Sequence, residues 1–139
     1  MDVYDVFCGH GTFNPLETSD NIDPMDMLRL KAERLVQWKR GSQPGPVRVT
    51  LFPTHRCNIR CSHCPKTWRD DPPGVFNEIS DERWLRLVEE GAELGVREWL
   101  FAGGGEPMLR RDLVMAMARK IRALGMNGIL QNNGTIVQD

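Results

Sequence analysis

The stretch EWLFAGGGEP, residues 98–107, decides the fold of this chain. Its first half, EWLFA, is a short and mostly apolar run, as expected of a strand buried inside a parallel sheet. Its second half, GGGEP, is a glycine-rich turn that ends the strand. The segments on either side of this stretch then determine which kind of sheet the strand joins.

The patterns predict a helix on each side of this strand. Ser80 can cap the first helix, which ends at Gly95, and the second runs from about Asp112 to Gly125. The apolar stripe of the first helix consists of Trp84, Leu85, Val88 and Ala92. The stripe of the second helix consists of Leu113, Met117, Ile121 and Leu124. Both helices therefore have one face suited to packing on a sheet.

Two further strands are predicted beyond these helices. VRVTLFP, residues 47–53, alternates apolar and polar side chains and stops at a proline, and GILQ, residues 128–131, is followed by NNGT. The order strand, helix, strand, helix, strand predicts a parallel α/β sheet under the right-handed crossover rule. In such sheets the loops after the strands converge at one edge, so we expect them to face one cavity.

The N-terminal part of the chain is predicted to precede this working unit. The first two dozen residues show no sustained period and are expected to be irregular. Asp23 can cap and Pro24 can open a helix that ends at Gly41 and serves as an outer packing element. Its apolar residues at near-helical spacing are Met27, Leu28, Leu35 and Trp38. We therefore expect an arm and helix over 1–45 and a core domain over 46–139.

Composition excludes some classes of function. The chain has 139 residues, 40% hydrophobic and 27% charged, with a net charge of −1, so it offers no basic field for nucleic acid. It contains no apolar run long enough to span a membrane and no secretory signal pattern, which makes a cytoplasmic location the default expectation. Three of the four cysteines crowd together, which favours metal ligation over a disulfide framework. Cys8 stands apart and is left unassigned.

The crowded cysteines are Cys57, Cys61 and Cys64, with the spacing C-x3-C-x2-C directly after the first predicted strand. Soft thiolates select an iron–sulfur cluster, zinc or copper(I). A structural zinc site and an ordinary electron-transfer cluster are each bound by four protein ligands. Three thiolates would instead leave one iron of a cubane iron–sulfur cluster without a protein ligand. The alternative is zinc with His55 or His63 as the fourth ligand.

The run CNIRCSHC, followed by GGGEP after the next strand, resembles the radical SAM superfamily, whose signature lies after the first strand of a partial (β/α)6 barrel. The resemblance covers roughly residues 47–135 and implies the N-terminal half of such a TIM-type barrel, with parallel strands. Because a full barrel needs about 200 or more residues, we expect a fragment of a longer enzyme.

The resemblance also implies a set of site residues. Cys57, Cys61 and Cys64 would bind a [4Fe–4S] cluster, and S-adenosylmethionine would chelate the open iron. His63 would lie near the adenine, and Glu106 would accept hydrogen bonds from the methionine amino group. The remaining residues expected to contact this cofactor are Gly104, Gly105, Pro107 and Asn133. No residue of the chain is assigned a catalytic role of its own.

The resemblance implies a radical reaction. An electron donor such as flavodoxin or ferredoxin would reduce the cluster, and cleavage of S-adenosylmethionine would yield methionine and a 5′-deoxyadenosyl radical that abstracts hydrogen from the substrate. The cysteine run also resembles members that modify peptides, so a peptide is one substrate class to test. The alternative function is a non-catalytic zinc or electron-transfer iron–sulfur module.

Overall fold

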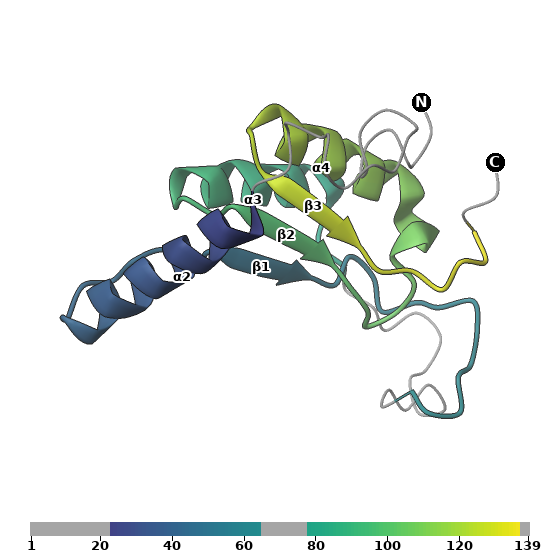
Figure 1. Cartoon of the computed structure of the whole chain (residues 1–139). Helices are drawn as coiled ribbons and strands as arrows, with labels where there is room; N and C mark the ends of the chain where they lie inside the picture. Colours follow the sequence, from purple (N-terminus) through teal and green to yellow (C-terminus); the bar gives the residue numbers. More distant parts are fainter. Residues whose placement is uncertain (1–22, 65–77, 137–139) are drawn as a thin grey trace.

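The computed structural model describes residues 23–64 and 78–136. Within these ranges the strands and helices alternate as the sequence predicts (Figure 1). The elements are α2 (Pro24–Lys39), β1 (Arg48–Leu51), α3 (Asp81–Glu93), β2 (Glu98–Phe101), the 3-10 helix η1 (Pro107–Arg110), α4 (Arg111–Ala123) and β3 (Asn127–Leu130). The expected irregular arm and Cys8 lie outside the described residues.

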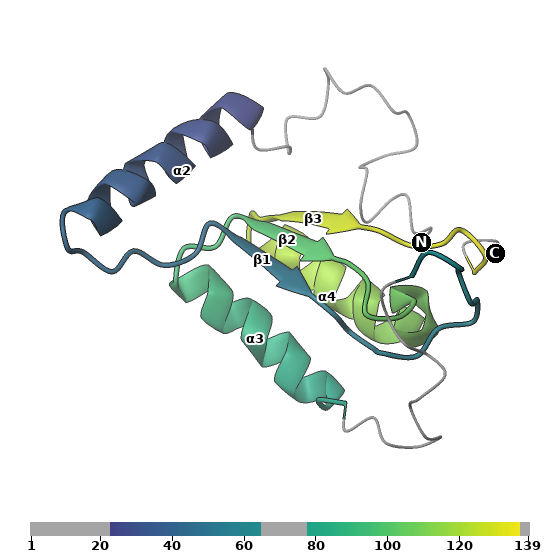
Figure 2. The same cartoon turned by 90° about the horizontal axis from the view of Figure 1, so that it is seen from below.

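The three strands form one parallel sheet in the order β1-β2-β3, which confirms the predicted α/β class. Phe101 at the end of β2 is in register with Leu51 of β1 and Leu130 of β3. When strand order follows chain order, right-handed crossovers place successive helices on the same face. Figures 1 and 2 show α3 and α4 together on one face of the sheet, which is the arrangement of a partial barrel.

The central strand β2 carries the core. Trp99 and Phe101 are fully buried, and the indole Nε1 of Trp99 donates to the sulfur of Met126 at 3.1 Å. Most residues of the predicted apolar stripes of α3 and α4 belong to the same hydrophobic core as β2. Leu124, at the end of α4, is exposed. Buried side chains of the two helices are Trp84, Val88, Leu113, Val114, Met115, Met117, Ala118 and Ile121. The period of 3.6 residues therefore identified the correct faces.

The helix ends also follow from the sequence. The Ser80 hydroxyl accepts a hydrogen bond from the Arg83 N–H at 3.3 Å, so it caps α3 as predicted. The 3-10 helix η1 between β2 and α4 is not predicted by the apolar pattern, because four residues carry too little periodicity. Strand β3 begins at Asn127, one residue before the predicted GILQ.

Gly91 lets α3 approach the central strand. It is buried, and a Cβ at this position would lie 2.6 Å from Cη2 of the buried Trp99 ring. We expect Gly91→Ala to lower the free energy of unfolding by about 1–3 kcal/mol through overpacking, although alanine is the better helix former by about 1 kcal/mol. Urea unfolding followed by circular dichroism measures this change, with Glu93→Ala at an exposed position of the same helix as the control. A more stable Gly91→Ala protein would contradict the packing described.

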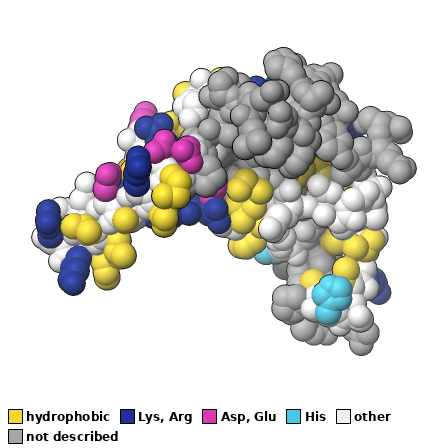
Figure 3. Space-filling model, in the orientation of Figure 1, with side chains coloured by type: hydrophobic (Ala, Val, Ile, Leu, Met, Phe, Trp, Pro, Cys, Tyr) yellow, Lys and Arg dark blue, Asp and Glu magenta, His cyan; other side chains and the backbone are white. Residues whose placement is uncertain are grey.

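Helix α2 departs from its predicted role as a packing element. Of its four predicted apolar positions only Met27 is buried, whereas Leu28, Leu35 and Trp38 are exposed, Trp38 by 67%. Figure 3 shows hydrophobic side chains along the outside of this helix. Its polar contacts include Arg34, which donates to the Pro46 carbonyl at 2.9 Å and to the Gly95 carbonyl at 2.7 Å. Near-helical spacing identified a helix but not a buried face.

No helix in the parts of the chain that the structure describes has both the length and the apolar character needed to cross a membrane.

Candidate cofactor site

The loops that follow β1, β2 and β3 line one cavity of about 270 Å3. Because the strands are parallel, their carboxyl ends point the same way, and Figure 1 shows the three arrowheads directed toward these loops. The lining residues are Cys57, Ile59, Cys61, Cys64, Gly103, Gly104, Gly105, Glu106, Pro107, Gln131, Asn132 and Asn133. The convergence expected from the strand order is present.

All three cysteines of the first loop are free thiols that line this cavity. Cys57 and Cys64 are half-buried and Cys61 is exposed, and the Cys64 N–H donates to the Cys61 carbonyl at 3.2 Å. Within the described ranges, no three side chains of His, Cys, Asp or Glu are grouped so that they could hold a single metal ion. The cavity thus gathers three soft thiol ligands.

The glycine-rich loop lies directly against the cysteine loop. The Gly105 N–H donates to the Thr54 carbonyl at 3.0 Å, and the Glu106 N–H donates to the Arg56 carbonyl at 2.8 Å. A Cβ on Gly105 would lie 2.6 Å from the carbonyl carbon of Arg56 and 2.7 Å from that of His55. Glycine at this position therefore permits the backbone contact that brings the two loops together.

The Glu106 carboxylate is almost completely buried at the centre of the site, with 3% of the residue exposed. Its Oε1 accepts from the Met108 N–H at 2.9 Å, which caps η1, and its Oε2 accepts from the Asn133 N–H at 2.8 Å. One carboxylate thus joins the second and third loops. Each carboxylate oxygen can accept more than one hydrogen bond, and Glu106 lines the cavity.

Asn58, which the sequence did not single out, ties the cysteine loop to the third loop. Its Oδ1 accepts from Asn133 Nδ2 at 2.8 Å, and its Nδ2 donates to the Thr135 hydroxyl at 2.6 Å. The Thr135 N–H in turn donates to Asn133 Oδ1 at 3.0 Å. The only sequence signal for this residue is its place next to Cys57, because its partners lie more than 70 positions away along the chain.

The structure brings most of the predicted site residues together. The three cysteines, the two predicted glycines, Glu106, Pro107 and Asn133 all line the cavity, whereas His63 is exposed and is not among the lining residues. His63 as a neighbour of adenine stays a prediction. Arg56, one of the two arginines flanking the cysteines, forms an ion pair with Glu78 at 3.4 Å.

Glu78 lies between two arginines beside the cysteine loop. Burial acts to raise the pKa of its carboxyl, but the hydrogen bond from Thr54 and the charges of Arg56 and Arg110 outweigh burial and leave the pKa below its ordinary value of 4.5. Glu78 therefore stays ionised in the folded chain at a pH where it is protonated in the unfolded chain.

This lowered pKa predicts how stability depends on pH. The contribution of ionised Glu78 to the free energy of unfolding is fully present above pH 4.5. It is lost as the pH falls through the lower pKa that Glu78 has in the folded chain. We expect the free energy of unfolding of the parent chain to approach that of Glu78→Gln as the pH falls below 4.5. Paired urea titrations of the two proteins at several pH values measure this difference. A difference that grows on acidification would contradict the assignment.

Comparison with known proteins identifies the family. The family model described as the radical SAM superfamily matches residues 51–138, more than half of the chain. The chain belongs to the radical SAM superfamily. The match begins at the last residue of β1 and includes all three loops that line the cavity. Radical SAM enzymes generally bind a [4Fe–4S] cluster and S-adenosylmethionine.

Three similar curated proteins carry two different enzyme names. PqqA peptide cyclase of Granulibacter bethesdensis is 43% identical over 76 residues, which are 55% of this chain and 20% of the relative. Fe-coproporphyrin III synthase of Methanosarcina barkeri is 32% identical over 122 residues, 84% of this chain and 29% of the relative. PqqA peptide cyclase of Xanthomonas campestris pv. campestris is 38% identical over 94 residues, 66% of this chain and 23% of the relative.

The radical SAM chain described here thus spans less than a third of the length of these relatives. No solved structure matches it significantly.

Proposed function

We propose that this radical SAM chain binds a [4Fe–4S] cluster through Cys57, Cys61 and Cys64 and binds S-adenosylmethionine in the same cavity. The observation that carries the proposal is that these three free thiols line one cavity with the glycine-rich loop and Asn133. When both are bound, the reduced cluster would cleave S-adenosylmethionine by one-electron transfer and so yield a 5′-deoxyadenosyl radical.

The chemistry of the donor set fits a cubane. A [4Fe–4S] cluster takes one thiolate per iron, so its ligands surround a cube and do not converge on a single ion. Three thiols that line one cavity are the number such a cluster needs when its fourth iron stays open. A structural zinc site would instead need four ligands at about 2.0–2.3 Å from one centre.

The glycine-rich loop after β2 has groups that could bind the methionine part of S-adenosylmethionine. Gly104 has φ +102, a backbone conformation that favours glycine, and Gly103 and Gly105 also lack side chains, so a ligand can approach this backbone closely. The buried Glu106 carboxylate can accept hydrogen bonds from the ammonium group of S-adenosylmethionine. We therefore assign Glu106 to that group, in addition to its contacts with Met108 and Asn133.

Glu106→Gln tests this assignment because it removes the charge and keeps the size of the side chain. We expect the variant to assemble its cluster and to bind S-adenosylmethionine at least about tenfold more weakly, since hydrogen bonds to charged groups contribute about 1.5–3 kcal/mol. Titration of the reconstituted chain with S-adenosylmethionine by calorimetry measures the affinity. Glu82→Gln, at an exposed position of α3, is the control. Unchanged affinity in Glu106→Gln would refute the assignment.

For the substrate we propose a peptide, because two of the relatives named above are peptide cyclases. The Methanosarcina relative is named for a porphyrin product. A reaction of this chain with a porphyrin and not with a peptide would therefore contradict the proposal. An external one-electron donor such as flavodoxin or ferredoxin would reduce the cluster. The division into an arm and helix over 1–45 and a core domain over 46–139 also stays a prediction.

Electron paramagnetic resonance of the reduced, reconstituted chain tests the function proposed here. We expect the cluster signal to change when S-adenosylmethionine is added, because the cofactor would bind the iron that has no thiolate. An unchanged spectrum would contradict the proposal and favour a non-catalytic iron–sulfur or zinc module.

A further inference from the structure

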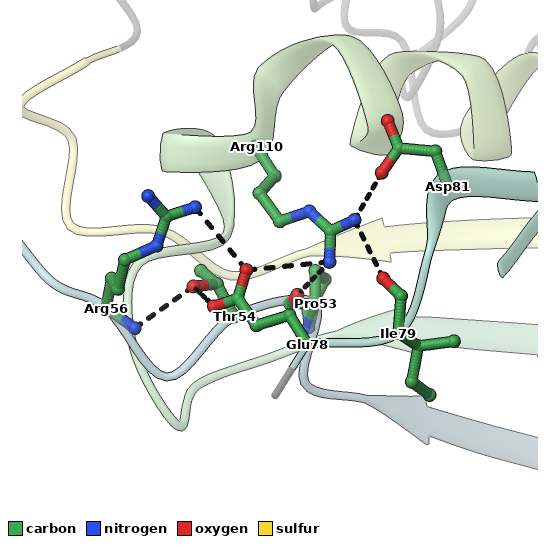
Figure 4. A network of polar contacts seen from close by, with 7 residues as sticks. All are labelled: Pro53, Thr54, Arg56, Glu78, Ile79, Asp81 and Arg110. Carbon is green, nitrogen blue, oxygen red and sulfur yellow. Dashed lines mark hydrogen bonds and ion pairs between the residues drawn. The ribbon is translucent and has the colours of Figure 1, made fainter. Parts of the chain in front are cut away.

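A network of charged and polar groups lies at the base of the cysteine loop (Figure 4). Thr54 stands just before the loop and is almost completely buried, with 1% exposed, and its hydroxyl donates to Glu78 Oε1. The other oxygen of Glu78 pairs with the Arg56 guanidinium at 3.4 Å. A single carboxylate, just before α3, thus contacts two of the three residues that precede Cys57.

Arg110 of η1 holds this carboxylate in place. Its side chain is only 11% exposed, and Nη1 lies 3.8 Å from Glu78 Oε2 while donating to the Pro53 carbonyl at 2.8 Å. Its Nη2 donates to the Ile79 carbonyl at 3.1 Å and pairs with Asp81. Figure 4 shows Arg110 reaching between the end of β1 and the segment that leads into α3.

The network acts on the backbone that carries the first cysteine. The Thr54 hydroxyl also accepts from the Arg56 N–H at 3.0 Å, and the Arg56 carbonyl accepts from the Glu106 N–H at 2.8 Å. If Glu78 releases Thr54, the hydroxyl is free to rotate away from the Arg56 N–H. The backbone of Arg56, which leads directly into Cys57, then loses one of these two hydrogen bonds.

We propose that Glu78, held by Arg110, is a positioning residue that fixes the direction in which Cys57 enters the cofactor cavity, and this inference rests on the proposed function. Glu78 does not line that cavity, so it would act through Thr54 and Arg56 and not through contact with the cofactor. None of the patterns in the sequence points to it, because Glu78 and Thr54 are 24 positions apart.

The test compares Glu78→Ala with Glu90→Ala, which breaks the exposed Arg83–Glu90 ion pair on α3. In the cluster-free chain we expect Glu78→Ala to speed amide hydrogen exchange at Arg56 and alkylation of the half-buried Cys57 about tenfold. The exposed Cys61 is the internal reference, because its alkylation rate should not change. Glu78→Gln should recover part of the protection, since its amide oxygen can still accept from Thr54.

A second readout is the iron that each protein keeps after reconstitution and a chelator wash, which should fall in Glu78→Ala and not in Glu90→Ala. The proposal is overturned if Arg56 and Cys57 keep their parent rates in Glu78→Ala. It is also overturned if amides of the buried α4 core accelerate equally, because that would show a general loss of stability. If the parent chain itself takes up no iron, the proposed function fails, while exchange and alkylation still decide the role of Glu78.

Discussion

Gly105→Ala is expected to separate the glycine-rich loop from the cysteine loop and to abolish most cluster assembly. The added Cβ would meet the carbonyl carbons of Arg56 and His55 at 2.6 and 2.7 Å, and these are backbone atoms that cannot rotate out of the way. Relief requires a shift of one loop, which breaks the hydrogen bonds from Gly105 to Thr54 and from Glu106 to Arg56. We expect a loss of about 1–3 kcal/mol in the free energy of unfolding.

Urea unfolding and iron analysis after reconstitution measure the two effects of Gly105→Ala. Gly103→Ala is the matched control for stability, because a Cβ on Gly103 meets nothing within 4 Å. We expect the control to unfold within about 0.5 kcal/mol of the parent chain. Equal stability of the two variants would show that the loops do not approach as closely as described.

Cys61→Ser is expected to remove the cluster while leaving the fold intact. The hydroxyl of serine is a harder donor than a thiolate and binds the iron of a cluster much more weakly. Because Cys61 is exposed, its loss removes no packing, and the free energy of unfolding should change by less than about 0.5 kcal/mol. Iron and sulfide per chain, and the visible absorption of the reconstituted protein, measure the effect.

Cys8→Ser provides the control for Cys61→Ser, because the sequence assigns Cys8 no ligand role. We expect this control to keep the iron and sulfide content of the parent chain. A Cys61→Ser protein with that same content would show that the cluster, if present, does not use this thiol.

The strands and α-helices of the fold were predictable because local sequence signals identify each of them, unlike η1. Ser80 and Gly95 bound α3, the stripes of α3 and α4 identify their buried faces, and the short apolar run at 98–102 identifies the central strand. The right-handed crossover rule then determines the sheet. The packing of α2 was not predictable, since the exposure of Leu35 and Trp38 depends on where the helix lies and not on its own sequence.

The candidate site was predictable only where one short segment carries the chemistry. The cysteine spacing and the GGGEP loop identify their residues because the donors and glycines are adjacent in sequence. Asn58, Glu78 and Arg110 escape this reasoning, because each acts through partners on other loops. An asparagine, a glutamate or an arginine without such a context is most often a surface residue. Only the folded chain shows which residues they contact.

Metal analysis of the parent chain after anaerobic reconstitution with iron and sulfide, in the presence of equimolar zinc, tests the central claim most directly. If Cys57, Cys61 and Cys64 hold a [4Fe–4S] cluster, the chain should retain about four iron and four sulfide, and little zinc. Retention of one zinc per chain without sulfide would contradict the claim.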